Sequence, residues 1–83
     1  MAIRVKVLYF AQAREAAGTG KEEVSLSEGS RVSDLVAASG KAHPGLQAMS
    51  RVVRLAVNAE VSGEGRVLEE GDTVAFLPPV AGG

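Results

Sequence analysis

Cysteine is absent from the 83 residues of the sequence. Its absence excludes a disulfide framework, a thiolate metal site and a cysteine nucleophile, so the fold must depend on its apolar core. A chain of this length buries only roughly 60–65% of the surface that it exposes when unfolded, which leaves no room for a deep active site walled by this chain alone. We therefore expect one small domain that relies on partner proteins for catalytic groups.

The sequence also lacks an excess of positive or negative charge, and it contains no long apolar run. Nine Lys and Arg residues oppose ten Asp and Glu residues for a formal net charge of -1, and the basic residues are spread along the chain. Nucleic-acid binding needs a clustered basic face, and a membrane span or a signal peptide needs an uninterrupted apolar run, so none of these is expected. The hydrophobic content of 46% is typical of a folded domain. These features predict a cytoplasmic protein that binds neither nucleic acid nor membranes.

Three features that resemble ligand sites have simpler explanations. His43 is the only histidine, and no cysteine or second histidine can share a metal with it, so we expect an exposed structural role and no metal site. Residues 63–65 read Gly-Glu-Gly, but the Lys-Ser/Thr pair and the long helix of a phosphate-binding loop do not follow, so we expect a turn. Arg14 and Glu15 can bind a partner or form an ion pair within a solvated helical turn, and both explanations stay open.

Alternation of apolar and polar residues predicts the strands. The first spans residues 2–10, and its outward face begins charged and ends apolar. Its inward residues are Ile3, Val5, Val7 and Tyr9, and its outward residues are Arg4, Lys6, Leu8 and Phe10. Further strands are expected over residues 22–26, 53–57 and 73–77, with a short strand at 60–61 after a tight turn at Asn58 and Ala59.

The helices are predicted from composition and from their end signals. Helix-forming residues followed by glycine predict a short helical turn over residues 11–17. The main helix is expected to have Ser30 as its N-cap and to end at Gly40. Pro44 can open a second, short helix that runs through Met49.

Together these elements predict an α+β fold, a mixed sheet with one main helix packed on one face. Residues 1–77 would form this domain, and residues 78–83 an extended C-terminal tail that reaches roughly 18 Å. The tail consists of Pro78, Pro79, Val80, Ala81, Gly82 and Gly83. Its prolines stop strand pairing, and its shrinking side chains let an ionised carboxylate enter a narrow channel, although a frayed chain end is the alternative.

Two segments of the sequence resemble a known family. The ending from Gly71 to Gly83, GDTVAFLPPVAGG, and the opening from Val5 to Glu15, VKVLYFAQARE, are similar to the small subunits of molybdopterin synthase, ubiquitin-like sulfur carriers of the MoaD type. Residues 56–58, Ala-Val-Asn, resemble the third-strand segment of this family, so the similarity covers nearly the whole chain. The terminal motif is shared by sulfur carriers generally, including the thiamine carrier ThiS. The FAQxRE segment and the Pro-Pro pair favour the molybdopterin branch.

This resemblance implies a β-grasp fold and a tail that serves as a sulfur donor. An ATP-dependent activating enzyme would adenylate the Gly83 carboxylate, and sulfur would convert the acyl-adenylate into a thiocarboxylate. The tail would then enter the large subunit of molybdopterin synthase, in a heterotetramer, and donate sulfur to cyclic pyranopterin monophosphate during molybdenum cofactor biosynthesis. The chain itself would bind no cofactor, since its activating partner uses the ATP and the large subunit holds the catalytic groups.

An apolar interface is expected near the tail. If the strands neighbour each other as in a β-grasp, four outward residues share the sheet face opposite the helix, namely Leu8, Phe10, Ala56 and Leu77. A contiguous apolar patch on an uncovered face is typical of a partner interface. The alternative is that single exposed apolar residues are common, and that Phe10 tucks under residues 11–17.

Three other functions stay open. The same activated Gly83 can form an isopeptide bond with a lysine, which would make the protein a ubiquitin-like modifier. It can also carry sulfur in another pathway, such as thiamine synthesis or another thiolation. The third alternative is a β-grasp binding module with an inert tail.

Overall fold

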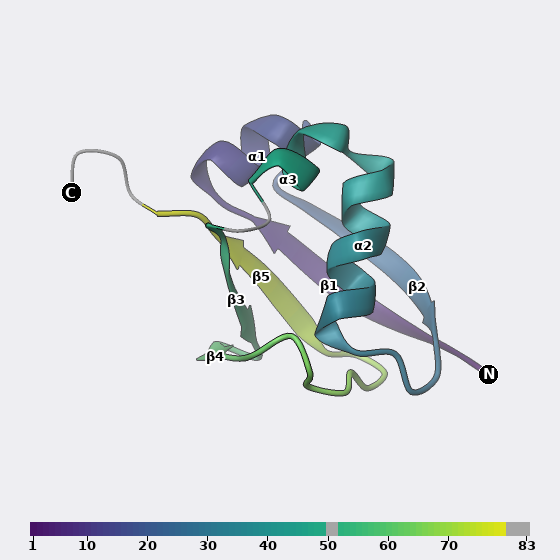
Figure 1. Ribbon diagram of the computed structural model, residues 1–83. Helices are drawn as coiled ribbons and strands as arrows, with labels where there is room; N and C mark the ends of the chain where they lie inside the picture. The colour runs from purple at the N-terminus through teal and green to yellow at the C-terminus, as the bar shows by residue number, and fades with distance from the viewer. Residues whose placement is uncertain (50–51, 80–83) are drawn as a thin grey trace.

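The computed structural model describes residues 1–49 and 52–79 (Figure 1). The types and the order of the elements agree with the predictions, and most of the bounds lie within one residue of those expected. In chain order the elements are β1 (Ala2–Tyr9), α1 (Ala11–Ala17), β2 (Lys21–Ser27), α2 (Val32–Ala42), α3 (Pro44–Ala48), β3 (Arg54–Val57), β4 (Glu60–Val61) and β5 (Thr73–Leu77).

The strands form one mixed sheet in the order β2-β1-β5-β3-β4. β1 and β5 run parallel, whereas β1 with β2, β3 with β5 and β3 with β4 are antiparallel. Figure 1 shows α2 across one face of the sheet, with α1 and α3 near the end at which β1 and β5 finish. The predicted α+β fold, a mixed sheet with one main helix on one face, is confirmed.

The apolar core lies between this sheet and its helices. Inward and outward residues alternate along β1 and β5 as predicted, because successive side chains of a strand point to opposite faces. The most buried large side chains are Tyr9, Phe76, Leu35, Leu68, Val5, Val7, Val32, Val57 and Val74. Leu68 belongs to no helix or strand, so periodicity did not identify it as a core residue.

Both predicted ends of the main helix are wrong. The N-cap is Arg31 rather than Ser30, and the Asp34 carboxylate accepts a hydrogen bond of 2.8 Å from the Arg31 backbone N–H. Gly40 does not end α2; it is buried inside the helix, and an added Cβ would lie 3.6 Å from Cβ of Gln47 in α3. Gly40 therefore lies at the contact between α2 and α3, where a Cβ would make an ordinary van der Waals contact, and this tertiary contact cannot be read from local propensity.

The predicted turn at Asn58 and Ala59 is confirmed. Both residues have positive φ angles, 50° and 70°, which is the backbone twist that a two-residue hairpin requires. The Asn58 side chain also accepts a hydrogen bond from the Thr73 N–H (3.1 Å) and donates one to Asp72 (3.0 Å). These bonds attach the β3–β4 turn to the start of β5, the strand that leads into the tail.

Candidate functional site: the open sheet face and the tail

The tail leaves the middle of the sheet. β5 lies between β1 and β3, and its last paired residue is Leu77, opposite Arg54. Strand pairing therefore ends before Pro78, as the missing proline N–H predicts. Val80, Ala81, Gly82 and Gly83 lie outside the described residues, so their insertion into a channel and the chemistry of the Gly83 carboxylate stay predictions.

One apolar row crosses the face of the sheet opposite α2. Strand register places Leu8 beside Ala75, Ala75 beside Ala56, and Ala56 beside Val61. Ala56 is on the predicted face, since Leu55 and Val57 on either side of it join the core, but it is only 5% exposed. Its short side chain therefore offers a partner little contact area, and its role at a partner interface stays a prediction.

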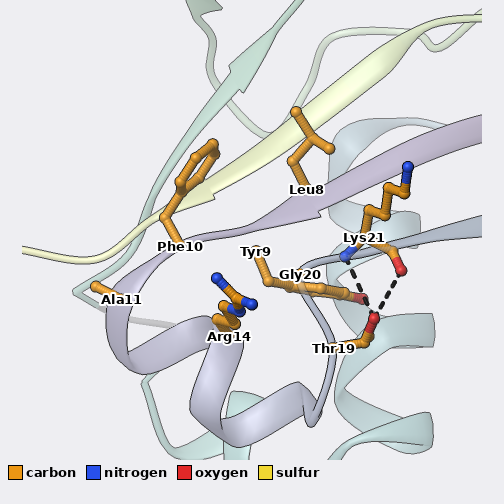
Figure 2. Close-up of a pocket in the computed structure, with 8 residues that line it drawn as sticks. All are labelled: Leu8, Tyr9, Phe10, Ala11, Arg14, Thr19, Gly20 and Lys21. Atoms are coloured by element: carbon orange, nitrogen blue, oxygen red, sulfur yellow. Dashed lines mark hydrogen bonds between the residues drawn. The ribbon is translucent and has the colours of Figure 1, made fainter.

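Phe10 is not part of β1, which corrects the predicted strand end. It is the N-cap residue of α1 and keeps an extended backbone, while Ala11 has a φ of 48° and turns the chain into the helix. Phe10 is 46% exposed, so it does not tuck under α1. Figure 2 shows its ring on the same side of β1 as the Leu8 side chain.

We call this surface the open-face patch; it consists of Leu8, Phe10, Ala56, Val61, Ala75 and Leu77. The sequence reasoning missed Val61, which is 67% exposed, because a two-residue strand has no periodicity to assign its face. The next row away from the tail is polar, since Lys6 is paired with Glu23 and Thr73. The apolar surface is therefore confined to the end of the sheet from which the tail leaves.

A polar cluster lies on the other side of β1, under the helices. The imidazole Nε2 of His43 is 2.9 Å from both carboxylate oxygens of Glu22, and the His43 ring meets Tyr9 edge-on with centroids 5.8 Å apart. Only 21% of the His43 side chain is exposed. The expected exposed position was wrong, because the junction of α2 and α3 folds His43 against β1 and β2. Its role in this structure is to connect the helices to the sheet.

Burial raises the pKa of Tyr9 above its ordinary value of 10.0, and the nearby Glu22 carboxylate adds to the increase, while the hydrogen bond to Ser39 opposes it. An unfolded chain therefore releases this proton at a lower pH than the folded protein. The contribution of Tyr9 to the free energy of unfolding therefore has its full value below the unfolded pKa of 10.0, and it is lost as the pH rises through the folded pKa.

We expect Tyr9→Phe to make the free energy of unfolding less sensitive to alkaline pH. At pH 8 the substitution should cost about 0.5–1.5 kcal/mol for the lost hydrogen bond to Ser39. Urea titrations of both proteins at about pH 8 and about pH 11 measure the difference. Equal losses of stability in the two proteins would contradict the assignment. Absorbance titration reports the phenol directly, since Tyr9 is the only tyrosine.

The described residues also test the sequence expectations about metal sites, membrane spans, residues 63–65 and the Arg14–Glu15 pair. No group of three or more metal-binding side chains occurs among residues 1–49 and 52–79. In the same ranges, no helix has the length and apolar character needed to cross a membrane. Residues 63–65 lie in a turn, with Arg66 N–H donating to the Gly63 carbonyl at 3.3 Å. Arg14 and Glu15 form no ion pair with each other, so the ion-pair explanation is wrong.

Comparisons with known proteins match almost the whole chain. The model of the ThiS family matches residues 7–83. A molybdopterin synthase sulfur carrier subunit of Mycobacterium tuberculosis is 43% identical over 82 residues, which cover 98% of this chain and 99% of the relative. A solved structure described as subunit 1 of a molybdopterin converting factor from Pyrococcus furiosus has a TM-score of 0.86 and 36% identity, and the match covers 94% of this chain and 99% of the other.

A second solved structure is described as a modifier. The small archaeal modifier protein 1 of Haloferax volcanii has a TM-score of 0.83 and 28% identity, over 94% of this chain and 99% of the other. The structural matches confirm the predicted β-grasp fold.

Proposed function

Because the chain belongs to the ThiS family, we propose that it is the sulfur-carrier subunit of a molybdopterin synthase. The observation that carries this proposal is the tail. The central strand β5 ends just before two prolines, beside an open apolar face. The chain then continues into a short segment that ends in Gly-Gly. The sulfur carrier subunit from Mycobacterium tuberculosis, which matches over almost its full length, supports the molybdopterin branch.

The chemistry takes place at the Gly83 carboxylate. A carboxylate is a poor electrophile, so its oxygen first attacks the α-phosphorus of ATP on an activating enzyme, and pyrophosphate leaves. A sulfide-level nucleophile then attacks the carbonyl carbon of the acyl-adenylate, AMP leaves, and a thiocarboxylate remains. The thiocarboxylate sulfur attacks an electrophilic carbon of the acceptor, cyclic pyranopterin monophosphate, and displaces an oxygen leaving group from that carbon. Water then cleaves the acyl–sulfur bond of the resulting thioester, which restores the Gly83 carboxylate and leaves the sulfur on the acceptor. The chain supplies the carboxylate and its presentation, and its partners supply the catalytic groups.

The partners follow from these steps. The large subunit of molybdopterin synthase receives the tail and covers the open-face patch, within a heterotetramer, and an ATP-dependent activating enzyme binds the chain beforehand. Contact around the base of the tail fixes the direction in which Gly83 projects. We place the protein in the cytoplasm, where ATP and the activating enzyme are available to it.

A second candidate function is protein modification, in which a lysine amine attacks the same acyl-adenylate. The full-length likeness to small archaeal modifier protein 1 favours keeping this alternative. The two functions begin with the same activated Gly83, and they differ in the nucleophile that follows.

We expect protein purified from its own cells to carry the mass increase of one oxygen replaced by sulfur. Intact-mass spectrometry measures this change, and a Gly83 deletion variant, which ends one residue early, is the matched control. Conjugates of higher mass that react with an antibody against the chain would support the modifier instead. Unmodified protein in cells that are actively making molybdenum cofactor would contradict the carrier function.

A further inference from the structure

A cleft of about 500 Å³ lies between α1, the start of β2 and the outward side of β1. Its floor includes Leu8 and Phe10, so the cleft continues the open-face patch toward α1 (Figure 2). The walls add Arg14 from α1 and Lys21 from β2. The cleft therefore combines an apolar floor with two cations, and none of the described residues that line it is acidic.

The two cations have no ion-pair partner among the described carboxylates. Described ion pairs join Arg4 to Glu23 and Glu70, and the His43 imidazole lies within hydrogen-bond distance of Glu22. Of the acidic residues that follow Lys21 in β2, Glu22 contacts His43 under the helices and Glu23 lies 3.8 Å from Arg4. Lys21 also borders a second hollow, which Lys6, Glu22 and Glu23 line, so the side of Lys21 that faces the cleft is the one without described acidic neighbours.

The backbone beside the two cations is ordered. The Arg14 side chain lies close to Gly20, since an added Cβ there would be 3.5 Å from Nε and 3.7 Å from Cζ of the guanidinium group, an ordinary van der Waals contact. The Thr19 hydroxyl donates to the Lys21 carbonyl at 2.9 Å and accepts from the Lys21 N–H at 3.4 Å, which fixes the first residue of β2 (Figure 2). A site whose backbone is already ordered loses less conformational entropy on binding.

We propose that this cleft binds an acidic segment of the large-subunit partner, with an apolar side chain of that segment on Leu8 and Phe10. A guanidinium pairs with a carboxylate through two parallel hydrogen bonds, and an ammonium adds a second point of attraction. The proposal rests on the proposed function, because it assigns a chemistry to part of the same docking surface. Charges at the rim of an interface act mainly on the association rate and on its salt dependence, and these are the quantities to measure.

The test uses two double variants of equal net charge. The cleft variant carries Arg14→Glu and Lys21→Glu. The control carries Lys41→Glu and Arg66→Glu, two exposed cations that do not line the cleft. Binding to the purified large subunit is followed by stopped-flow fluorescence at ionic strengths of about 0.05 M and about 0.5 M. Circular dichroism shows whether each variant is folded.

We expect the cleft variant to associate about tenfold more slowly than the control at low ionic strength, and the difference to shrink at high ionic strength. Equal rates and equal salt dependence in the two variants would overturn the proposal. Slower binding of the cleft variant to the activating enzyme alone would also overturn it, since the acidic segment would then belong to that enzyme. Failure of the unsubstituted chain to bind the large subunit would instead refute the proposed function.

Discussion

Adding one residue after Gly83 is expected to reduce sulfur transfer by at least about 100-fold while the domain remains folded. One residue of extended chain moves the terminal carboxyl carbon by about 3.3–3.6 Å. A displacement of even 1 Å at a reacting centre can cost about 100-fold in rate, because nucleophile and carbonyl no longer meet in a productive geometry. The fold should not change, because strand pairing ends at Leu77, before the tail begins.

The measurement is dithiolene formation with purified activating enzyme, large subunit and sulfur source. A chain with one residue added before Met1 is the matched control, because it has the same length and an unaltered tail. Intact mass must show that the added residue has not been removed. Sulfur transfer at the control's rate by a chain that keeps its extension would contradict the role of Gly83 as the reacting end.

Phe10→Ala is expected to weaken binding to the large subunit about 30-fold, with little change in the free energy of unfolding. Truncation of a buried aromatic anchor at an interface costs about 2 kcal/mol or more. In the free chain Phe10 is 46% exposed, and a substitution at such a position changes stability by only about 0.5 kcal/mol. Affinity and the denaturant midpoint are measured on the same preparation.

Val67→Ala is the matched control for this prediction. Val67 is 47% exposed but lies outside the open-face patch, so its truncation should leave the affinity unchanged. Equal affinities of the Phe10 and Val67 variants would show that docking does not use the patch. A large drop of the denaturant midpoint for Phe10→Ala, with unchanged affinity, would show that its ring contributes to the core instead.

The sequence alone determined the class of fold and the point at which the last strand ends. Ile3, Val5 and Val7 repeat with period two, and this pattern is direct evidence of a strand with one buried face. The prolines at 78 and 79 ended the last strand for a local reason, since they lack the N–H that pairing needs. Such predictions succeed because each depends on the covalent structure of a few neighbouring residues.

Tertiary structure decided the features that depend on residues far apart in the chain. Gly40 lies inside α2 and is buried where α3 contacts it, and the His43 side chain is only 21% exposed because the helix junction places it against Glu22. Strand register brought Val61 into line with Ala56 and Ala75. Each of these outcomes is set by packing and register, and the energy of those contacts exceeds the weak local preferences that a sequence pattern reports.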